Sequence, residues 1–501
     1  MVLFTKPPKY VQVSRDPLES GYKTLVVPVW RGGDGQPVLE GFAGQLDEAL
    51  GGPLRSAIEA GGFKADTGEV YKVYRDGREV IYVGLGEPSR EDPQRLESVR
   101  RGVAKAVKGL AEAREKILLC LGDLGETESM EAAIAAGLAA YRLEAFKGEA
   151  KRVLQEVGVH GAQLDLDTVS AVVEGVYLAR DVANAPPNHL TPQRLAEVVE
   201  DLFTQLPNVS VEVLNYDRLV REGFGGIVNV GRGSSHKPRL IIIRYNGGEG
   251  DPVALVGKTV VFDTGGINLK TSPNIVSMRS DKAGGAAVLG ALWILAKTGA
   301  RINVVALLPA VINAPGGEAY LPGDVIRMWD GTMVEVGNTD AEGRLILADA
   351  IAYAAKELGA SLIVDLATLT GAMVVALGPL VAGYFTRSDE EARLLEEASK
   401  ATGDRVWRMP LVDEYRKLLA RNGPLGDTGN IGGRYGGAII GALFLERFTH
   451  GSTWIHLDIA GPGIGMEAGP VAMEYWPDNL APGYGARLIA EYLSRRGGGG
   501  G

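Results

Sequence analysis

Short apolar runs alternate with longer helical patterns along the first third of the chain. The runs KTLVVPVW, EVIYVGLG and KILLCLGDL predict strands, whereas LESVRRGVAKAVKGLAEARE has the spacing of an amphipathic helix. An Ala-containing stretch, roughly residues 126–157, predicts a long helix before the polar segment HGAQLDLDT. This alternation is typical of an α/β domain, which we place at residues 1–165 with its linking helix.

The rest of the chain repeats this alternation on a larger scale. The apolar runs VALVGKTVVFDTGG, RINVVALLPAV, ASLIVDLATLTG and TWIHLDIAG lack a clean polar alternation, which indicates strands covered on both faces. The sequence predicts a larger α/β domain over residues 166–496, with a mainly parallel or mixed sheet sandwiched by helices. Residues 497–501 are all glycine and are expected to form a flexible tail.

Composition and charge narrow the class of protein. The 501 residues are 46% hydrophobic and 23% charged, which is ordinary for a soluble globular protein. Lys and Arg number 52 against 62 Asp and Glu, and the net charge of −10 disfavours nonspecific binding to nucleic acid or anionic membranes. MVLFTKPPKY lacks the apolar core of a signal peptide, and no apolar stretch reaches membrane-spanning length. We expect a cytoplasmic protein that acts on small molecules.

Several familiar chemistries are excluded by residue type or spacing. The single cysteine, Cys120 in KILLCL, rules out an intramolecular disulfide or a Cys-rich zinc site and is expected to be a buried thiol. None of the five histidines belongs to an HExxH motif, and His456 in WIHLDIAG is expected to be a hydrogen-bonded core residue. A P-loop would need glycine where Pro252 stands, and no GxSxG motif frames a serine.

The candidate chemistry lies in two segments, GKTVVFDTGGINLKTSPNIVSMRSDKAGG and NTDAEGRL. Their ionisable residues are Lys258, Asp263, Lys270, Asp281, Asp340, Glu342 and Arg344. Three Asp and one Glu can neutralise about two divalent metal ions, and a metal pair roughly 3.5 to 4 Å apart activates water against a carbonyl or phosphoryl group. A salt-bridge network with the lysines and the arginine is the alternative to metal binding. Hydrolysis is the first hypothesis.

The predicted elements place these carboxylates at the end of the sheet where ligands bind. Asp263 and Asp340 are each expected where a strand gives way to a Gly-containing loop, beyond its carboxyl end. Apolar residues after Asp340 recur at three- and four-residue spacing until Gly359, which predicts a helix. Asp340 and Glu342 would then stand at the N-terminus of that helix, where its dipole stabilises anions.

At these residues the chain resembles the leucyl or cytosol aminopeptidases, peptidase family M17. The octapeptide NTDAEGRL matches the family signature throughout, and the spacing of Lys258, Asp263, Lys270 and Asp281 agrees with it. Similarity extends over about residues 179–461, including ARDVANAPPNHLTP, DLATLTGA and WIHLDIAG, whereas the N-terminal third carries no comparably specific motif. Two departures are Thr264, where serine is usual, and Lys282, where an apolar residue is common.

The resemblance implies a metalloexopeptidase with two divalent metal ions per subunit, zinc or manganese, with cobalt or magnesium as further options. Asp263 and Glu342 would bridge the metals, Asp340 would complete one site, and Lys258 with Asp281 the other. To act as a ligand, Lys258 must be neutral, which requires a strongly lowered pKa. A water or hydroxide between the metals would be the nucleophile.

The same resemblance implies the catalytic groups and the substrate. Lys270 would stabilise the developing oxyanion, and Arg344 would hold a bicarbonate ion that acts as general base. The specificity pocket would be formed by Met278, Thr368, Gly371 and Ala460. Short peptides with leucine-like N-terminal residues are the implied substrates, and a homohexamer is the implied assembly.

Two other functions stay open on the sequence. A binuclear phosphohydrolase would share metal-activated water, but the histidine ligands typical of such sites are absent from the two segments. A DNA-associated regulatory protein is the second alternative, because some relatives bind DNA, although the acidic composition argues against it. Release of amino acids from peptides would exclude the first, and salt-dependent retention on DNA would favour the second.

Overall fold

The computed structural model describes residues 5–149, 153–271, 273–465 and 468–498, which form two compact units. Unit 1 combines residues 1–177 with 472–478, and unit 2 combines 178–471 with 479–501. The two α/β domains expected from the sequence are confirmed, and unit 2 is the larger. The division between the units, after Tyr177, lies inside helix α5 (Leu166–Asn184), whereas the sequence pattern places the domain boundary near residue 165. Of the expected glycine tail, residues 499–501 lie outside the described residues.

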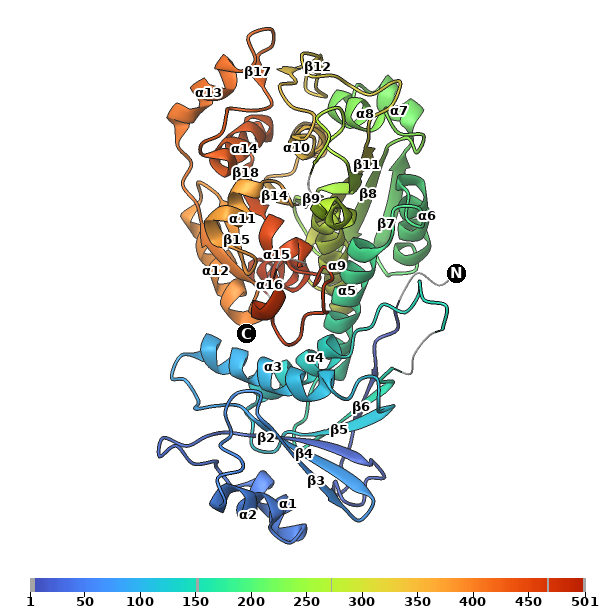
Figure 1. The fold of residues 1–501 in the computed structure, drawn as a ribbon. Helices are drawn as coiled ribbons and strands as arrows, with labels where there is room; N and C mark the ends of the chain where they lie inside the picture. Colours follow the sequence, from blue (N-terminus) through green and yellow to red (C-terminus); the bar gives the residue numbers. More distant parts are fainter. Residues whose placement is uncertain (1–4, 150–152, 272, 466–467, 499–501) are drawn as a thin grey trace. The chain divides into compact units, whose positions relative to one another are not determined.

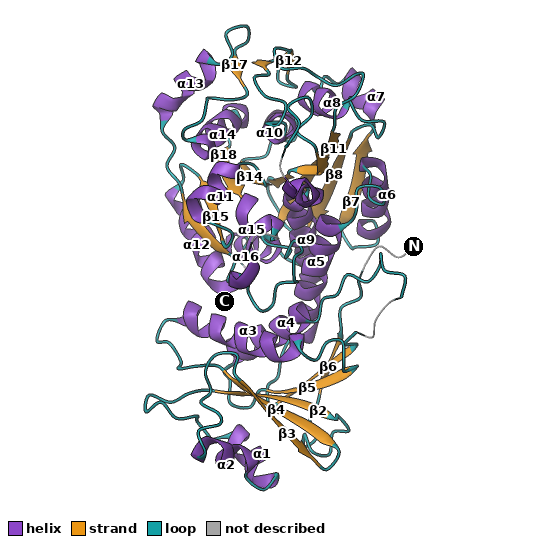
Figure 2. Ribbon diagram, in the orientation of Figure 1, coloured by secondary structure: helices purple, strands orange, loops and turns teal. Residues whose placement is uncertain are grey.

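Unit 1 is built on a mixed six-stranded sheet with the strand order β1-β6-β5-β2-β4-β3 (Figure 2). The strands are β1 (Lys9–Gln12), β2 (Thr24–Val29), β3 (Val70–Arg75), β4 (Arg78–Gly84), β5 (Lys116–Cys120) and β6 (Glu156–His160). Its helices are α1 (Phe42–Ala49), α2 (Pro53–Glu59), α3 (Asp92–Lys108) and α4 (Glu126–Ala139). Only β3 runs antiparallel to its neighbour. Cys120 is buried in this core, as predicted.

The prediction of one helix over residues 126–157 is wrong. Helix α4 ends at Ala139, and the chain returns as strand β6, which pairs in parallel with both β1 and β5. Val157 and Val159 are fully buried there, and Gly158 lies so close to Tyr22 that a side chain would not fit. A central position in a sheet satisfies the backbone of this short segment, a tertiary effect that the Ala-containing run before it does not signal.

Unit 2 contains a nine-stranded, mostly parallel sheet with the order β16-β15-β18-β14-β9-β11-β8-β7, and β10 pairs with β11 (Figure 1). Its strands are β7 (Val209–Leu214), β8 (Arg239–Asn246), β9 (Val253–Gly257), β10 (Thr259–Asp263), β11 (Asn303–Asn313), β14 (Leu362–Ala367), β15 (Val381–Phe385), β16 (Arg405–Arg408) and β18 (Thr453–Asp458). A small sheet joins β12 (Val325–Arg327), β13 (Met333–Glu335) and β17 (Thr428–Gly429). The mixed sheet predicted for this domain is confirmed.

Helices cover both faces of the large sheet. The longer helices of unit 2 are α6 (Pro192–Phe203), α9 (Ala283–Thr298), α10 (Gly343–Lys356), α12 (Asp389–Thr402), α14 (Gly437–Glu446) and α16 (Ala486–Arg496). The shorter ones are α7 (Tyr216–Arg221), α8 (Gly225–Gly231), α11 (Gly371–Leu377), α13 (Arg416–Arg421) and α15 (Ala460–Ile464), with the 3₁₀ helix η1 (Pro273–Ser280) before α9. Helix α9 packs on β9 and β14, and α16 packs on α9.

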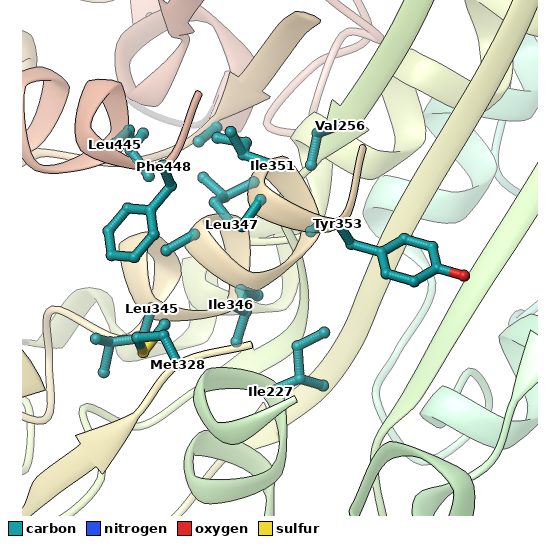
Figure 3. Packing of buried hydrophobic residues seen from close by; sticks show 14 of the residues in the cluster. Ile227, Val256, Met328, Leu345, Ile346, Leu347, Ile351, Tyr353, Leu445 and Phe448 are labelled. Carbon is teal, nitrogen blue, oxygen red and sulfur yellow. The ribbon is translucent and has the colours of Figure 1, made fainter. Parts of the chain in front are cut away.

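Helix α10 is the centre of the main core of unit 2. Leu345, Ile346, Leu347 and Ile351 are fully buried, and Figure 3 shows them packed against side chains of α8 and the segment after α14. Residues 343–354 of α10 are all buried, so the helix is enclosed on every side over most of its length. Its N-terminus is therefore held rigidly with respect to the sheet. In the described part of the chain, no helix combines the length and hydropathy that a membrane crossing requires.

Candidate active site

Lys258 stands at a break between two strands. The sequence predicts one continuous run over VALVGKTVVFDTGG, but β9 ends at Gly257 and β10 begins at Thr259. The backbone N–H of Lys258 donates to Leu366 O (2.9 Å), and its carbonyl accepts from Gly285 N (2.8 Å). The break lets β9 lie between β11 and β14 while β10 pairs with β11 alone. The buried Lys258 side chain is thereby fixed at the carboxyl end of β9, a central strand of the sheet.

Asp263 is the last residue of β10 and is oriented by neutral donors. Its Oδ1 accepts from Gly265 N and from Asn313 Nδ2, both at 2.8 Å. Asn313 ends the neighbouring strand β11, is fully buried, and also donates to Thr339 O (3.0 Å). Because these bonds occupy Oδ1, the second carboxylate oxygen of Asp263 faces the other ionisable groups.

Asp340 and Glu342 lie at the start of α10, as predicted. Glu342 is the N-cap residue of the helix and is buried, and Asp340 precedes it in a turn. Thr339 ties this turn to the loop after β10, because its hydroxyl donates to Gly265 O (2.7 Å). The backbone N–H of Asp340 donates to Asn338 Oδ1 (2.8 Å). The carboxylates from two distant segments are thus held side by side.

The structure brings all five predicted metal ligands and Lys270 into one cluster. One oxygen each of Asp263, Asp340 and Glu342 lies within 4.8 Å of the others, a spacing that can hold a metal ion. Lys258 Nζ lies 3.0 Å from Asp281 Oδ1 and 2.9 Å from Glu342 Oε1. Lys270 Nζ lies 2.9 Å from Asp263 Oδ2 and 2.5 Å from Asp340 Oδ1. The Oδ2 atom of Asp281 is buried without a hydrogen-bond partner among the described residues, as an unused ligand atom would be.

Burial and mutual repulsion dominate the electrostatics of the cluster. Burial, followed by the charge of Asp263, raises the pKa of Glu342, and burial also raises the pKa of Asp281. Burial alone would favour a neutral Lys258, but the carboxylates around it outweigh burial and raise its pKa. A neutral lysine ligand therefore requires a dication, which would take over the neutralisation of the carboxylates and repel the ammonium.

Arg344 is a buried cation whose side chain has an unused hydrogen-bond donor. It is the second residue of α10, is almost fully buried, and donates from Nη1 to Asn430 O (2.8 Å). Its buried Nε has no hydrogen-bond partner within the described ranges. Burial lowers the pKa of Arg344 to about 10, so the side chain remains charged at neutral pH. A buried cation with an unused N–H can bind a small anion.

The predicted pocket residues come from elements that adjoin the cluster. Met278 lies in η1, Gly371 begins α11 and Ala460 begins α15, which contacts both α11 and η1. Thr368 connects this group to the cluster, because its hydroxyl donates to Asp281 Oδ1 (2.7 Å) and its carbonyl accepts from Lys258 Nζ (2.9 Å). Gly371 is exposed, whereas Thr368 and Ala460 are buried.

Two residues flagged in the sequence serve the core. His456 is fully buried, its ring stacks with the rings of Trp454 and Phe385, and its Nδ1 lies 2.6 Å from Asp365 Oδ1, which confirms a hydrogen-bonded core histidine. Lys282 is also fully buried, and its Nζ donates to the carbonyls of Ala185 (3.1 Å) and Val261 (3.3 Å). It therefore acts as a cross-link between segments behind Asp281.

Three supporting residues were missed from the sequence: Asn313, Asn430 and Asp458. Asn430 donates to Asn338 O (2.7 Å) and accepts from Gly337 N (2.8 Å), so it connects Arg344 to the turn before α10. Asn313 and Asp458 each end a buried strand. A polar residue directly after an apolar run is the signal that selected Asp263, and it applies equally to these two.

Buried carboxylates, cations and unused donors at the carboxyl ends of α/β strands define the class as metal-dependent hydrolases. A phosphate-binding loop or a nucleophilic triad would need residues that the chain lacks at this site.

Comparison with known proteins identifies the family. Residues 177–490 match the catalytic domain of the cytosol aminopeptidase family, and residues 26–150 match its N-terminal domain. The chain is 55% identical to a "Probable cytosol aminopeptidase" of Aeropyrum pernix, with both chains covered in full, and 40% identical to one of Xylella fastidiosa, with 84% of this chain and 89% of that one covered. The protein belongs to the cytosol aminopeptidase family, whose members are M17 metallopeptidases.

Solved structures agree with this assignment. The Mn complex of the bottromycin maturation enzyme superposes with a TM-score of 0.82 at 30% identity, covering 95% of this chain and 99% of the other. A mutant of tomato leucine aminopeptidase superposes with a TM-score of 0.83 at 30% identity, covering 97% and 96%. One of these similar structures thus contains manganese, and the other is a leucine aminopeptidase.

Proposed function

We propose that this aminopeptidase removes leucine-like apolar residues from the N-terminus of short peptides, using two divalent metal ions. The observation that carries the proposal is the convergence of Lys258, Asp263, Asp281, Asp340 and Glu342. Asp263 and Glu342 would be shared between the metals, Asp340 would serve one of them, and Lys258 with Asp281 the other. When bound, the metal pair would supply Lewis acidity, a lowered pKa for water and a position for the substrate's free α-amine.

Manganese or zinc is the proposed metal. The donor set is carboxylate oxygen with one amine nitrogen, which suits borderline and hard divalent ions rather than soft ones. The manganese complex of a similar enzyme supports manganese. Cobalt and magnesium remain compatible with the same donors.

Lys270 and Arg344 are the proposed catalytic side chains. Burial opposes the charge of Lys270, but Asp263 and Glu342 outweigh it and raise the pKa of Lys270, so the ammonium keeps its protons at neutral pH. Such a cation can donate to the scissile carbonyl oxygen as negative charge develops there. Arg344 would hold bicarbonate, which would supply a general base, and the unused Nε of Arg344 supports this role.

Specificity would come from the adjoining pocket. Met278, Thr368, Gly371 and Ala460 would line it, and their small or largely apolar side chains would suit an apolar first side chain of the substrate. The amine of the substrate must be free, so cleavage would stop at the first peptide bond.

We also propose a cytoplasmic homohexamer. The names of the curated relatives support the location. Large apolar side chains such as Val375 (89% exposed) and Tyr435 (82% exposed) are the kind of surface that an oligomer covers. Sedimentation of the purified protein would test the assembly.

The activity is tested with a leucine-initiated tripeptide and its N-acetylated form, each with added Mn²⁺ or Zn²⁺. We expect release of leucine from the free peptide only. A phosphomonoester and a DNA fragment test the two alternatives in the same buffer. Absence of leucine release with every metal tested, or turnover of the phosphomonoester instead, would contradict the proposal.

A further inference from the structure

Asp458 is a buried carboxylate for which the proposed mechanism has no role. It ends β18 beside Ala367 at the end of β14, and it is fully buried. Its Oδ1 accepts from the backbone N–H groups of Leu369 (3.1 Å), Thr370 (3.4 Å) and Ala460 (3.2 Å). Its Oδ2 accepts from the hydroxyl of Thr370 (2.6 Å). One side chain therefore fixes the whole segment that follows β14.

That segment is attached directly to one half of the cluster. Thr368 precedes Leu369, and it bonds to Lys258 through its carbonyl (2.9 Å) and to Asp281 through its hydroxyl (2.7 Å). The other half is held by different residues, because Asp263 is oriented by Asn313 and the turn before α10 by Thr339. A change at Asp458 should therefore reach Lys258 and Asp281 first.

A carboxylate is the group that these bonds need. The hydroxyl of Thr370 accepts from Met373 N (3.1 Å), so its only proton is free to go to Asp458 Oδ2. The backbone N–H groups require an acceptor at Oδ1. Asparagine offers one acceptor oxygen and one NH₂ group. In one orientation the NH₂ group faces the backbone N–H donors, and in the other the Thr370 hydroxyl proton loses its acceptor.

We propose that Asp458 is a positioning residue that fixes residues 368–370 and so preorganises Lys258 and Asp281 for one of the two metal ions. The inference rests on the proposed two-metal site. Residues that orient metal ligands commonly change metal affinity by 10- to 100-fold when replaced. We expect Asp458→Asn to weaken one Mn²⁺ site by about that factor while the other site keeps its affinity.

The experiment titrates the full chain, stripped of metal with a chelator, with Mn²⁺ in competition with a fluorescent chelator. The variants are Asp458→Asn, Thr370→Val and Thr370→Ser. Thr370→Val removes the hydroxyl bonded to Asp458 and should weaken the same site, whereas Thr370→Ser keeps the hydroxyl and should restore wild-type affinity. Thr370→Val keeps the inference testable where Asp458→Asn fails to fold.

Asp349→Asn is the matched control. Asp349 is also a fully buried carboxylate that accepts from two backbone N–H groups, those of Ile227 (3.0 Å) and Trp329 (2.8 Å), but these belong to α8 and the turn after β12. This variant should leave the affinity of both Mn²⁺ sites unchanged.

Each outcome separates the inference from the proposed function. Two Mn²⁺ sites of unchanged affinity in both Asp458→Asn and Thr370→Val would overturn the inference and leave the proposed function standing. Equal weakening of both sites, or the same weakening in the Asp349→Asn control, would also overturn it. A wild-type protein that binds no Mn²⁺ would overturn the proposed two-metal function itself.

Discussion

Lys258 Nζ lies 2.9 Å from Glu342 Oε1, which joins the break between β9 and β10 to the first turn of α10. The carboxylates around Lys258 raise its pKa above the usual lysine value, so a metal ion must displace a proton from it. We therefore predict that Mn²⁺ affinity rises with pH, by about tenfold per pH unit where one proton is released per metal.

Calorimetric titration in two buffers of different ionisation enthalpy measures the released protons. The Lys258→Met variant, which has no amine to deprotonate, is the control and should release fewer. An affinity independent of pH would show that Lys258 is not a ligand.

Lys270 should contribute to turnover without holding metal. Its Nζ lies 2.9 Å from Asp263 Oδ2. The ammonium therefore competes with a metal ion for this carboxylate, and removing it removes no metal ligand. We predict that Lys270→Ala lowers kcat by about 10²- to 10³-fold, the effect of losing one oxyanion donor, with full metal content. Asp263→Ala should lose both metal and turnover. Metal analysis and kinetics on the same samples check this, and equal metal loss in both variants would contradict the role of Lys270.

Arg344 should make the reaction sensitive to bicarbonate. Its buried Nε is the donor without a partner in the described structure, and the guanidinium remains charged at neutral pH. We predict that bicarbonate added to a carbonate-free assay raises kcat of the wild type, whereas Arg344→Met is slower by about 10²-fold and does not respond. Metal content should be equal in the two proteins. If bicarbonate does not change kcat of the wild type, bicarbonate is not the general base.

Most of the fold and of the ligand set could be predicted from the sequence because their signals are local. Strand-end carboxylates such as Asp263 follow an apolar run, and the spacing after Asp340 predicts α10, which begins at Gly343. The pattern could not predict β6, because its place in the sheet depends on β1 and β5, which are distant in the chain.

The contacts of the supporting residues could not be predicted, for the same reason. Asp458 acts through residues 88 and 89 positions earlier, and Asn313 orients Asp263 across 50 positions. Hydrogen bonds over such separations have no periodic signature. The charge state of Lys258 could not be predicted from the sequence either, because it depends on how closely the carboxylates of Asp281 and Glu342 approach Lys258 Nζ in the folded chain.

Gly343 should tolerate no side chain, because a Cβ atom there would lie 2.6 Å from Lys258 Cε and 2.8 Å from Nζ. Gly343→Ala must displace the lysine while every proposed ligand remains in the sequence. We predict a loss of about tenfold or more in Mn²⁺ affinity. Gly317→Ala is the control, since a Cβ at that position meets nothing within 4 Å. Equal Mn²⁺ affinity of the two variants would show that Lys258 adjusts freely.

Asp349 should give the catalytic unit a pH-dependent stability. Burial raises the pKa of Asp349 to about 7 in the folded protein, whereas an exposed aspartate in the unfolded chain has a pKa of about 3.9. Between these values the folded state holds a proton that the unfolded state has lost, so the free energy of unfolding falls as pH rises from about 4 to 7. The shift corresponds to about 4 kcal/mol at most. The asparagine in Asp349→Asn cannot ionise. The free energy of unfolding of the variant should therefore rise relative to that of the wild type between about pH 4 and 7, and the difference should stay constant above pH 7.

Chemical denaturation of both proteins at pH 5 and pH 8, with chelator present to exclude metal binding, measures this difference. Hydrogen exchange of the Ile227 and Trp329 amides gives the local readout, because both amides donate to Asp349. At pH 5 the asparagine should lower the free energy of unfolding by about 1–3 kcal/mol, because its NH₂ group faces one of these backbone donors. A stability difference that stays the same at both pH values would mean that backbone donation keeps Asp349 ionised despite its burial.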